Sequence, residues 1–336
     1  MKKVQAPNSW KKPEKHIEKL LTEKWYRILC NIYKSIFEAT YAFYKKEKIT
    51  PMLFPVTTGS ISSPMGLGSD SVPVSVSING NKVYLADSMQ FSLEIGARLS
   101  DTGAYYIMPT FRGEKMDERH LNEFVHSEVE IIGDINDVMK LANRYIKYMI
   151  RYLLKHNSSE IKSIAGDITH MQDALKKSFK QISYDQALQE LQHIHGATEK
   201  LNDEIFNITK KGEKHLLQKY GDFLWLTNLP WLMVPFYQAR QKDGKSAYAA
   251  DLLAGIGEIL GCGQRVLSVK ELDESLNAHK VDDKEYVWYR KMREIKQIQT
   301  SGFGLGIERF ILWVLKHNDI RDCTILLRDH NNITMP

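Results

Sequence analysis

Three glycines at alternate positions, Gly302, Gly304 and Gly306, are followed after one residue by Glu308 and Arg309. Glycine at every second position of a strand leaves one face without side chains, so a flat group can lie against the backbone. An arginine early in the following helix, beside exposed backbone N–H groups, is suited to a phosphate. The spacing matches neither a Walker loop nor a dinucleotide fingerprint. The stretch therefore indicates a phosphate site or, alternatively, only a glycine-rich turn before an ordinary helix.

A second group of charged residues falls on two predicted strands, 105–112 and 122–132, which are joined by a polar turn. Residues two or four apart on a strand share a face. The residues expected to line one surface of this hairpin are Arg112, Glu114, Phe124, Glu128 and Glu130. An exposed hairpin crossed by salt bridges is the alternative, because burying these charges requires a ligand or mutual pairing.

Two carboxylates, Asp251 and Glu258, stand at the ends of an apolar loop that is interrupted by glycines. Two strands joined in this way can present both carboxylates to one point. Oxygen ligands of this kind suit Mg²⁺, which keeps several waters and shares phosphate oxygens. The structural alternative is that Asp251 caps a turn and Glu258 pairs with Arg265.

The arginines, the acidic pair and an aromatic residue on a hairpin together favour an ATP site over a sugar or lipid site. Coupling a carboxylate to AMP converts a poor electrophile into a mixed anhydride with a good leaving group. A protein that catalyses this step must align the carboxylate with the α-phosphate and neutralise the charge that develops there. Arginines from two directions, together with Mg²⁺, would do so.

The composition is that of an ordinary globular chain of 336 residues, with 43% hydrophobic and 26% charged residues. No apolar run approaches the roughly 18 residues needed to cross a bilayer, and the N-terminus lacks the apolar segment of a secretory signal. Three scattered cysteines fit reduced thiols. We therefore expect a cytoplasmic protein without membrane association. Residues 1–22 form a basic extension, and the net charge of +5 permits a polyanionic ligand without requiring one.

Hydrophobic periodicity predicts an α+β fold. The expected elements are a long helix at 16–46, a strand at 52–55, a hairpin at 72–78 and 82–86, helices at 88–98, 137–155 and 307–315, and strands at 223–227 and 248–253. Residues 57–70 have the composition of a loop that could act as a lid. Residues 158–220 are expected to be a mostly helical insertion or connector.

These groups, in this order, resemble the class II aminoacyl-tRNA synthetases, and most closely the aspartyl and asparaginyl branch with its tRNA-independent relative, archaeal-type asparagine synthetase A. The long helix and the strand ending at Pro55 resemble motif 1, the dimer interface of that family. Phe111-Arg-Gly-Glu with Arg119-His-Leu-Asn-Glu-Phe resembles motif 2, and Gly302 to Arg309 resembles motif 3. The resemblance implies a catalytic domain over 23–336, built on an antiparallel sheet of six to seven strands flanked by helices.

The resemblance also implies roles for individual residues. The ATP-binding residues would be Arg112, Glu114, Arg119, His120, Phe124, Gly304, Gly306 and Arg309. Among these, Arg112, Arg309 and His120 would be catalytic, and the adenine would lie between Phe124 and Arg309. Asp251 and Glu258 would hold Mg²⁺, while Gln90, Glu94, Glu128 and Arg265 would bind the amino acid.

Two departures from the family pattern bear on the substrate and on the acceptor. Aspartate-specific members have a lysine where this chain has Leu93, whereas Leu93 followed by Glu94 is similar to asparaginyl enzymes. A carboxylate at position 94 argues against aspartate as the substrate, because it would repel the side-chain carboxylate of aspartate. The tRNA ligases of this family also place an anticodon-binding β-barrel of about 100 residues before motif 1, and no such segment precedes the helix here.

The expected function is therefore an AMP-forming ligase that adenylates aspartate, asparagine or a related amino acid and transfers the acyl group to ammonia or another amine. Two alternatives stay open: a true aminoacyl-tRNA ligase that holds the acceptor stem with its basic N-terminus, and a catalytically silent nucleotide-binding paralogue. The expected partners are ATP, Mg²⁺, the amino acid, the amine acceptor and a second copy of the chain, with tRNA less favoured.

Overall fold

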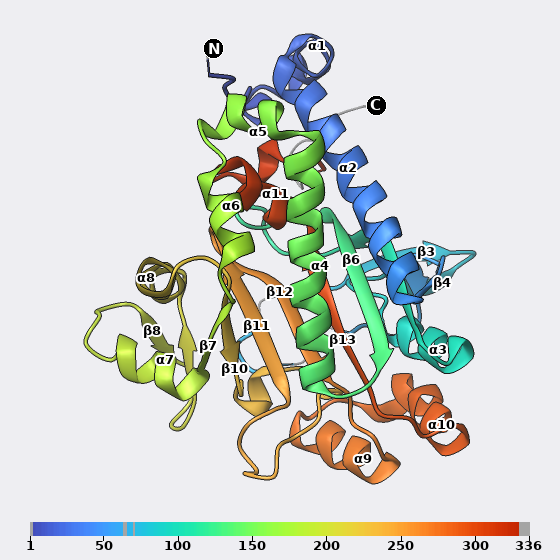
Figure 1. Ribbon diagram of the computed structural model, residues 1–336. Coiled ribbons are helices and arrows are strands. Elements are labelled where there is room, and N and C mark those ends of the chain that lie inside the picture. Colours follow the sequence, from blue (N-terminus) through green and yellow to red (C-terminus); the bar gives the residue numbers. More distant parts are fainter. Residues whose placement is uncertain (1–2, 63–65, 70, 329–336) are drawn as a thin grey trace.

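The structure is a computed structural model that describes residues 3–62, 66–69 and 71–328. Its centre is a sheet of eight strands in the order β1-β5-β6-β13-β12-β11-β10-β7 (Figure 1). The strands are β1 (Thr50–Pro51), β5 (Gly103–Phe111), β6 (Glu123–Ile132), β7 (Lys180–Ser183), β10 (Leu224–Thr227), β11 (Ala249–Ala254), β12 (Gly257–Gln264) and β13 (Thr300–Gly306).

The six inner strands are antiparallel to one another, and the two edge strands are parallel to their neighbours. β1 pairs in parallel with β5, and β7 pairs in parallel with β10. The predicted α+β fold and its antiparallel sheet are confirmed. The resemblance implied six to seven strands, and the sheet has eight, because the short parallel edge strands β1 and β7 add to the six antiparallel ones.

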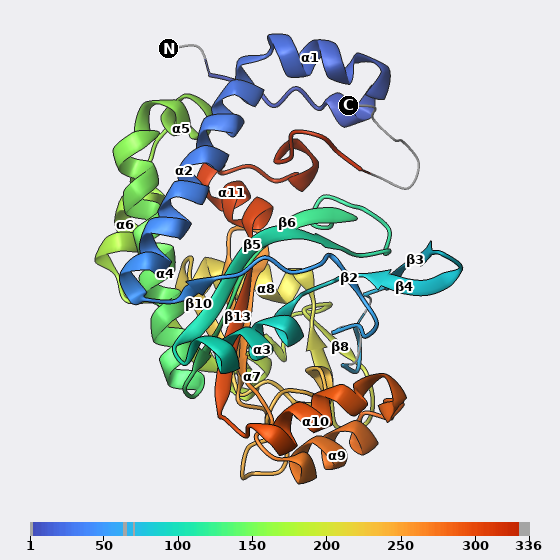
Figure 2. The same ribbon diagram turned by 90° about the vertical axis from the view of Figure 1, so that its right-hand side faces the viewer.

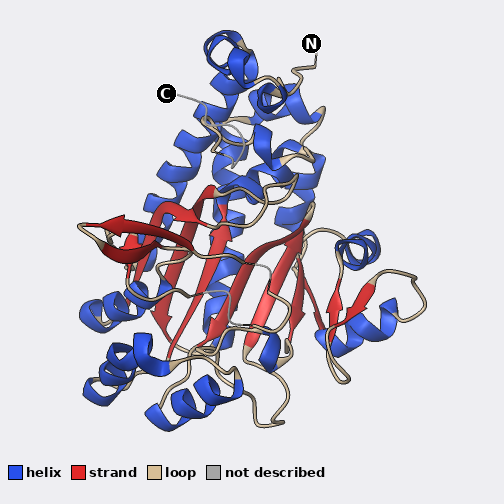
Figure 3. Ribbon diagram, turned by 180° about the vertical axis from the view of Figure 1, so that it is seen from behind, coloured by secondary structure: helices blue, strands red, loops and turns tan. Residues whose placement is uncertain are grey.

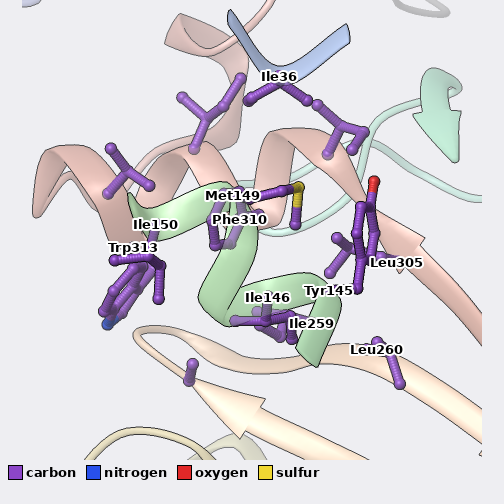
Figure 4. Close-up of a cluster of buried hydrophobic side chains, with 14 of the residues drawn as sticks. Ile36, Tyr145, Ile146, Met149, Ile150, Ile259, Leu260, Leu305, Phe310 and Trp313 are labelled. Atoms are coloured by element: carbon purple, nitrogen blue, oxygen red, sulfur yellow. The ribbon is translucent and has the colours of Figure 1, made fainter. Parts of the chain in front are cut away.

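Three helices cover one face of the sheet: α2 (Lys24–Glu47), α4 (Ile135–His156) and α11 (Ile307–Leu315). Their apolar side chains interlock with those of β12 and β13, as Figure 4 shows for Tyr145, Met149 and Phe310. α4 begins at a capping box in which the carboxylate of Asp134 accepts the backbone N–H of Asp137 at 3.1 Å. This layer buries one face of the sheet and leaves the other for the site.

The predicted helix at 16–46 is interrupted at Glu23, which has an extended backbone (φ −80°, ψ 133°). The two pieces are α1 (His16–Thr22) and α2, and two short turns, η1 (Ser9–Lys11) and η2 (Pro13–Lys15), precede them. The break lets the N-terminal segment fold back, so that Ser9 Oγ forms a hydrogen bond with the hydroxyl of Tyr26 on α2. Periodicity alone could not locate this break, because the apolar spacing continues across it.

The predicted insertion at 158–220 is helical only in part. It contains α5 (Ser158–Ala165), α6 (Thr169–Lys176), α7 (Tyr184–Leu191), α8 (Lys210–Tyr220), the edge strand β7, and a small ribbon of β8 (Thr198–Lys200) with β9 (Phe206–Ile208). The buried residues of α7 and α8, among them Leu191 and Leu216, form a cluster with side chains of β10 and β11. The segment is therefore integrated into the main sheet.

The remaining elements surround the open face. A second sheet contains β2 (Thr57–Thr58), β4 (Asn81–Leu85) and β3 (Val74–Ile78), and its β3–β4 hairpin projects from the body in Figure 2. The helices are α3 (Gln90–Ser100), α9 (Val269–Ala278) and α10 (Val287–Ile295), with the short turns η3 (Trp231–Met233), η4 (Asp283–Tyr286) and η5 (Ile320–Asp322). The predicted strand at 52–55 is wrong: only Thr50–Pro51 pairs.

Figure 3 shows the face of the sheet that α2, α4 and α11 leave uncovered, with loops running across it. Among the described residues, no helix combines the length and apolar character needed to cross a membrane. The open face is where the charged side chains of the inner strands gather.

Candidate active site

A cavity of about 460 Å³ lies on the open face. It is lined by nearly all the residues that the sequence singled out: Gln90, Arg112, Glu114, Arg119, His120, Phe124, Glu128, Asp251, Glu258, Arg265, Gly304, Gly306 and Arg309. Alternation along the strands explains this gathering, because Val129 and Leu305 pack against the helices while Glu128 and Gly304 turn to the other face. The structure thus brings together three motifs that are far apart in the chain.

The register of the strands sets one row of residues across the floor of the cavity. Glu128 is paired with Gly304, Gly304 with Gly261, and Gly261 with Asp251. A Cβ at Gly304 would lie 3.1 Å from Glu128 Oε1, and a Cβ at Gly261 would lie 3.3 Å from Asp251 Oδ1. The glycines therefore make room for the carboxylates of neighbouring strands as well as for a ligand.

One predicted residue, Glu94, does not belong to this lining. Its side chain is completely buried and is held by Arg293 Nη2 at 3.1 Å and by the hydroxyl of Tyr289. The preceding residue, Leu93, is also fully buried, in a cluster with Tyr106. The expectation that Glu94 contacts the amino acid is not supported by this geometry, since α3 turns position 94 toward α10.

Arginines from motif 2 and motif 3 converge on the cavity. The guanidinium carbon of Arg112 lies 5.6 Å from the centre of the Phe124 ring, and Arg309 Nη1 donates to the carbonyl oxygen of Glu258 at 2.9 Å. Burial, with Arg119 and Arg112 nearby, lowers the pKa of Arg309, although Glu258 opposes the shift. Within the described residues, Arg112 Nε is buried without a hydrogen-bond partner. Several cations that face one cavity are stabilised by an anion such as a phosphate chain.

The two expected metal carboxylates face the same space, since a Cβ at Gly261 would lie 3.3 Å from both Asp251 Oδ1 and Glu258 Oε1. Burial, with Glu258 and Glu213 nearby, raises the pKa of Asp251 well above its usual range. A divalent cation would relieve this repulsion. No group of three or more potential metal ligands exists in the described part of the chain. Two carboxylates alone fit Mg²⁺ that shares its other ligands with water and phosphate.

The alternative pairing of Glu258 with Arg265 is wrong, because Arg265 binds another carboxylate. Arg265 Nη2 lies 2.8 Å from Glu130 Oε2 and Nε lies 3.1 Å from Glu130 Oε1, while Nη1 donates to Gln238 Oε1 at 3.2 Å. A Cβ at Gly302 would lie only 2.0 Å from Glu130 Oε2. Gly302 is therefore required by this ion pair. Arg265 lines the cavity, whereas Glu130, which was expected on the same surface, is fully buried and does not line it.

The neighbouring wall contains Glu128 and Gln90. Glu128 accepts the hydroxyl of Ser88 at 2.6 Å and lies 3.0 Å from His126 Nδ1. Burial alone would raise the pKa of Glu128, but the contacts with His126 and Ser88 lower it below its usual value. Gln90 Nε2 is buried with no partner among the described residues. The ionised carboxylate of Glu128 is suited to the ammonium group of an amino acid. The N–H groups of Gln90 Nε2 are suited to the carboxylate of the amino acid.

The motif 2 loop carries Arg119 and His120 along the rim. Arg119 Nη2 lies 2.7 Å from Glu213 Oε2 of α8, and His120 Nδ1 lies 2.8 Å from Asp117 Oδ1. Sequence reasoning assigned no role to Glu213 or Asp117. The spacing of residues in the sequence offered no signal for Glu213, because Glu213 is 94 residues from its partner Arg119.

The predicted lid lies partly outside the described residues, which omit 63–65 and Asp70. Of its described part, Ser62 and Ser69 line the cavity. The backbone N–H of Leu67 donates to the carbonyl oxygen of Leu232 at 2.6 Å, and that of Ser62 to Asp87 Oδ1 at 3.1 Å. This segment thus lies against the cavity wall near η3.

Residues 14–329 match the sequence family described as tRNA synthetases class II (D, K and N). The match covers most of the chain, and the chain therefore belongs to this family. It includes all three motifs and the segment at 158–220.

Within the family, the chain is similar to asparagine–tRNA ligases. It is 28% identical over 294 residues to that of Koribacter versatilis, a match that covers 85% of this chain and 65% of the relative. It is 33% identical over 250 residues to that of Pyrococcus abyssi, covering 73% of this chain and 56% of the relative. The chain thus spans less than two thirds of the length of these relatives.

Solved structures of similar proteins share the fold. The crystal structure of asparaginyl-tRNA synthetase from Pyrococcus horikoshii complexed with asparaginyl-adenylate has a TM-score of 0.87 and 25% identity, covering 98% of this chain and 74% of that one. The asparaginyl-tRNA synthetase of Entamoeba histolytica, also in complex with asparaginyl-adenylate, has a TM-score of 0.81 at 21% identity over 96% of this chain and 74% of that one.

Proposed function

We propose that this chain is an ATP-dependent, AMP-forming ligase that activates asparagine, or a closely related amino acid, as its acyl-adenylate. The observation that carries the proposal is the convergence of Arg112, Phe124, Arg309 and the Asp251–Glu258 pair on one cavity. An adenylating enzyme needs all of these groups within reach of one nucleotide. Membership of the synthetase family supports the same reaction.

In the proposed reaction, a carboxylate oxygen of the amino acid attacks the α-phosphorus of ATP, and the bond to the β-phosphate breaks. Pyrophosphate leaves with the electron pair. Arg112 neutralises charge on the α-phosphate, Arg309 and Phe124 enclose the base, and Arg119 and His120 approach the outer phosphates. Glu114 is proposed to receive the adenine amino group. Mg²⁺ held by Asp251 and Glu258 would shield the phosphate charge.

The Arg265–Glu130 pair supports a neutral side chain on the substrate. Glu130 already occupies two nitrogens of Arg265, so a substrate carboxylate would be a second anion on one guanidinium. An amide oxygen can accept one of the remaining N–H groups without that repulsion. The charge arrangement therefore favours asparagine over aspartate, and the names of the relatives agree.

The acceptor is proposed to be tRNA. Sequence reasoning favoured ammonia or another amine, but no relative described above supports an amine acceptor, and those relatives are asparagine–tRNA ligases. A hydroxyl of tRNA would attack the acyl carbon of the adenylate, form an ester and release AMP, which completes the reaction.

Amino-acid-dependent exchange of labelled pyrophosphate into ATP tests the first step. Asparagine should support exchange and aspartate should support much less, while glutamine and glutamate serve as controls for side-chain length. Charging of total tRNA with labelled asparagine tests the acceptor. No exchange with any amino acid would refute the ligase. Exchange without charging, together with asparagine formation from aspartate and ammonia, would favour the amine acceptor.

A further inference from the structure

The segment at 158–220 meets the candidate active site at α8, where it holds the motif 2 loop at two points. Glu213 Oε2 lies 2.7 Å from Arg119 Nη2, and Lys210 Nζ lies 2.8 Å from Asp117 Oδ2. Asp117 Oδ1 also accepts the backbone N–H of Arg119 at 2.7 Å. The helix therefore fixes both the backbone of the loop and the side chain that it presents to the cavity.

The contact between Arg119 and Glu213 is enclosed by the turn before the candidate metal carboxylate. The two side chains are only 11% and 14% exposed. A Cβ at Gly257 would lie 2.3 Å from Arg119 Nη2 and 2.4 Å from Glu213 Oε2. Glycine is needed at this position, next to Glu258, because any side chain would displace the pair.

The remaining donors of Arg119 are available for a ligand. Glu213 engages Nη2, whereas Nε of Arg119 is buried and has no hydrogen-bond partner among the described residues. Both residues line the cavity that holds Arg309, Asp251 and Glu258. An arginine side chain otherwise has many rotamers, and holding it by one nitrogen reduces the entropy lost when the others bind a phosphate.

We propose that Glu213 is a positioning residue for nucleotide binding, which holds Arg119 so that its other N–H groups meet the outer phosphates of ATP. This inference rests on the proposed function, because it takes Arg119 as a phosphate ligand. A purely electrostatic role for Glu213 would have the opposite sign, since a carboxylate near a triphosphate weakens its binding. The two roles therefore predict opposite results when the carboxylate is removed.

Binding of ATP and of AMP to the whole chain, measured by calorimetry in the presence of Mg²⁺, separates these roles. Glu213→Leu removes the hydrogen-bond acceptor, and Glu213→Gln keeps an acceptor without the charge. We expect Glu213→Leu to bind ATP roughly tenfold more weakly, as loss of a hydrogen bond to a charged group implies. AMP, which lacks the outer phosphates, should bind with unchanged affinity. Glu213→Gln should restore most of the ATP affinity, and Gln218→Ala, an exposed change on the same helix, should have no effect.

A double-mutant cycle with Arg119→Ala completes the test. Because Glu213 is proposed to act through Arg119, Glu213→Leu should add no further loss of ATP affinity in the Arg119→Ala background. Lys210→Ala removes the second contact of α8 with the loop, at a side chain that is half exposed, and should weaken ATP binding by a smaller factor. It serves in place of Glu213→Leu if that variant does not fold.

Tighter ATP binding by Glu213→Leu, an equal loss for AMP, or additive losses in the cycle would overturn the inference. Full ATP affinity in both Glu213→Leu and Lys210→Ala would do the same. The binding measurements need no turnover. Wild-type protein that binds ATP but shows no pyrophosphate exchange would refute the ligase function. The double-mutant cycle would then still test the role of Glu213. Wild-type protein that binds no ATP would refute both.

Discussion

The hydroxyl of Tyr33, on α2, lies 3.0 Å from Glu308 Oε1 on α11 and 2.8 Å from the carbonyl oxygen of Cys323. One hydroxyl proton cannot serve both acceptors well. A protonated Glu308 removes the conflict, because it donates to Tyr33 while Tyr33 donates to Cys323, and its other oxygen still accepts the backbone N–H of Val125 at 3.1 Å. The motif 1 helix, the motif 3 helix and the strand that follows the motif 2 loop thus meet at one carboxyl group.

This geometry predicts a pH dependence of stability. Burial raises the pKa of Glu308 from 4.5 to about 7. A raised pKa means that the folded state binds the proton more tightly, so the contribution is complete below pH 4.5 and is lost as the pH rises through 7. It amounts to at most roughly 3 kcal/mol.

Urea unfolding of wild type and Glu308→Gln between pH 5 and 8 checks this expectation. The advantage of wild type over the variant should shrink as the pH rises, whereas Glu274→Gln, an exposed change on α9, should follow wild type throughout. Parallel curves for wild type and Glu308→Gln would show that Glu308 is ionised in the folded protein across this range.

Arg309→Ala should reduce pyrophosphate exchange by roughly 100- to 1000-fold, because the cation that encloses the base with Phe124 and holds the nucleotide in the cavity is lost. Arg309→Lys should recover only part of the rate, since the planar fork of donors is missing. Lys316→Ala, just beyond the other end of α11, is the control. Normal exchange in Arg309→Ala would place the nucleotide elsewhere.

Asp251→Asn should have opposite effects on stability and on activity. Burial and nearby carboxylates raise the pKa of Asp251 well above its usual range, so the neutral amide should stabilise the unliganded protein by on the order of 1 kcal/mol at pH 8. The same change should raise the Mg²⁺ concentration needed for half-maximal exchange at least about tenfold. Thermal unfolding without Mg²⁺ and a Mg²⁺ titration measure the two effects, with Asp243→Asn on an exposed turn as the control. An unchanged Mg²⁺ requirement would argue against Asp251 as a ligand.

Glu130→Gln should shift the substrate preference toward aspartate. Without the Glu130 carboxylate, Arg265 keeps its positive charge and can attract a substrate carboxylate. The ratio of kcat/KM for asparagine and aspartate in pyrophosphate exchange should fall about tenfold or more. A constant ratio would mean that the side chain of the amino acid binds away from Arg265.

The chain is expected to form a homodimer through its motif 1 region. Large apolar side chains are exposed there, with Tyr41 on α2 57% exposed and Leu53 after β1 90% exposed. Light scattering should give twice the chain mass for wild type and the single mass for Tyr41→Glu combined with Leu53→Asp. Phe206→Glu, on the distant ribbon β8–β9, should leave the mass unchanged. A monomeric wild type would contradict the expectation.

How far the sequence could predict the site is clear from particular residues. Arg112, Phe124 and Arg309 were found because they lie in short motifs with a fixed strand or helix period. Glu94 was misplaced because it lies one helical turn after Gln90, while its carboxylate is held by Tyr289 and Arg293, a tertiary contact that helix spacing does not predict. Glu213 was missed because its role depends on a contact between a loop and a helix that are joined only by tertiary folding.

The same distinction applies to the fold. The β3–β4 hairpin followed from alternation and from the Asn79-Gly80 turn, whose residues have φ values of 51° and 79°. The antiparallel sheet followed from the resemblance of the three motifs to the synthetase family. The interruption at Glu23 and the parallel edge strands depend on which surfaces meet in three dimensions. Hydrophobic periodicity in the sequence carries no information about these tertiary contacts.

The strand that residues 180–183 contribute has a consequence for the whole molecule. β7 covers the outer backbone edge of β10 along its full length, from Leu224 to Thr227. A chain from which 158–220 had been deleted would leave the N–H and C=O groups on that side of β10 unsatisfied, and such an edge invites pairing with another chain. Variants of this protein that lack 158–220 should therefore be prone to aggregation.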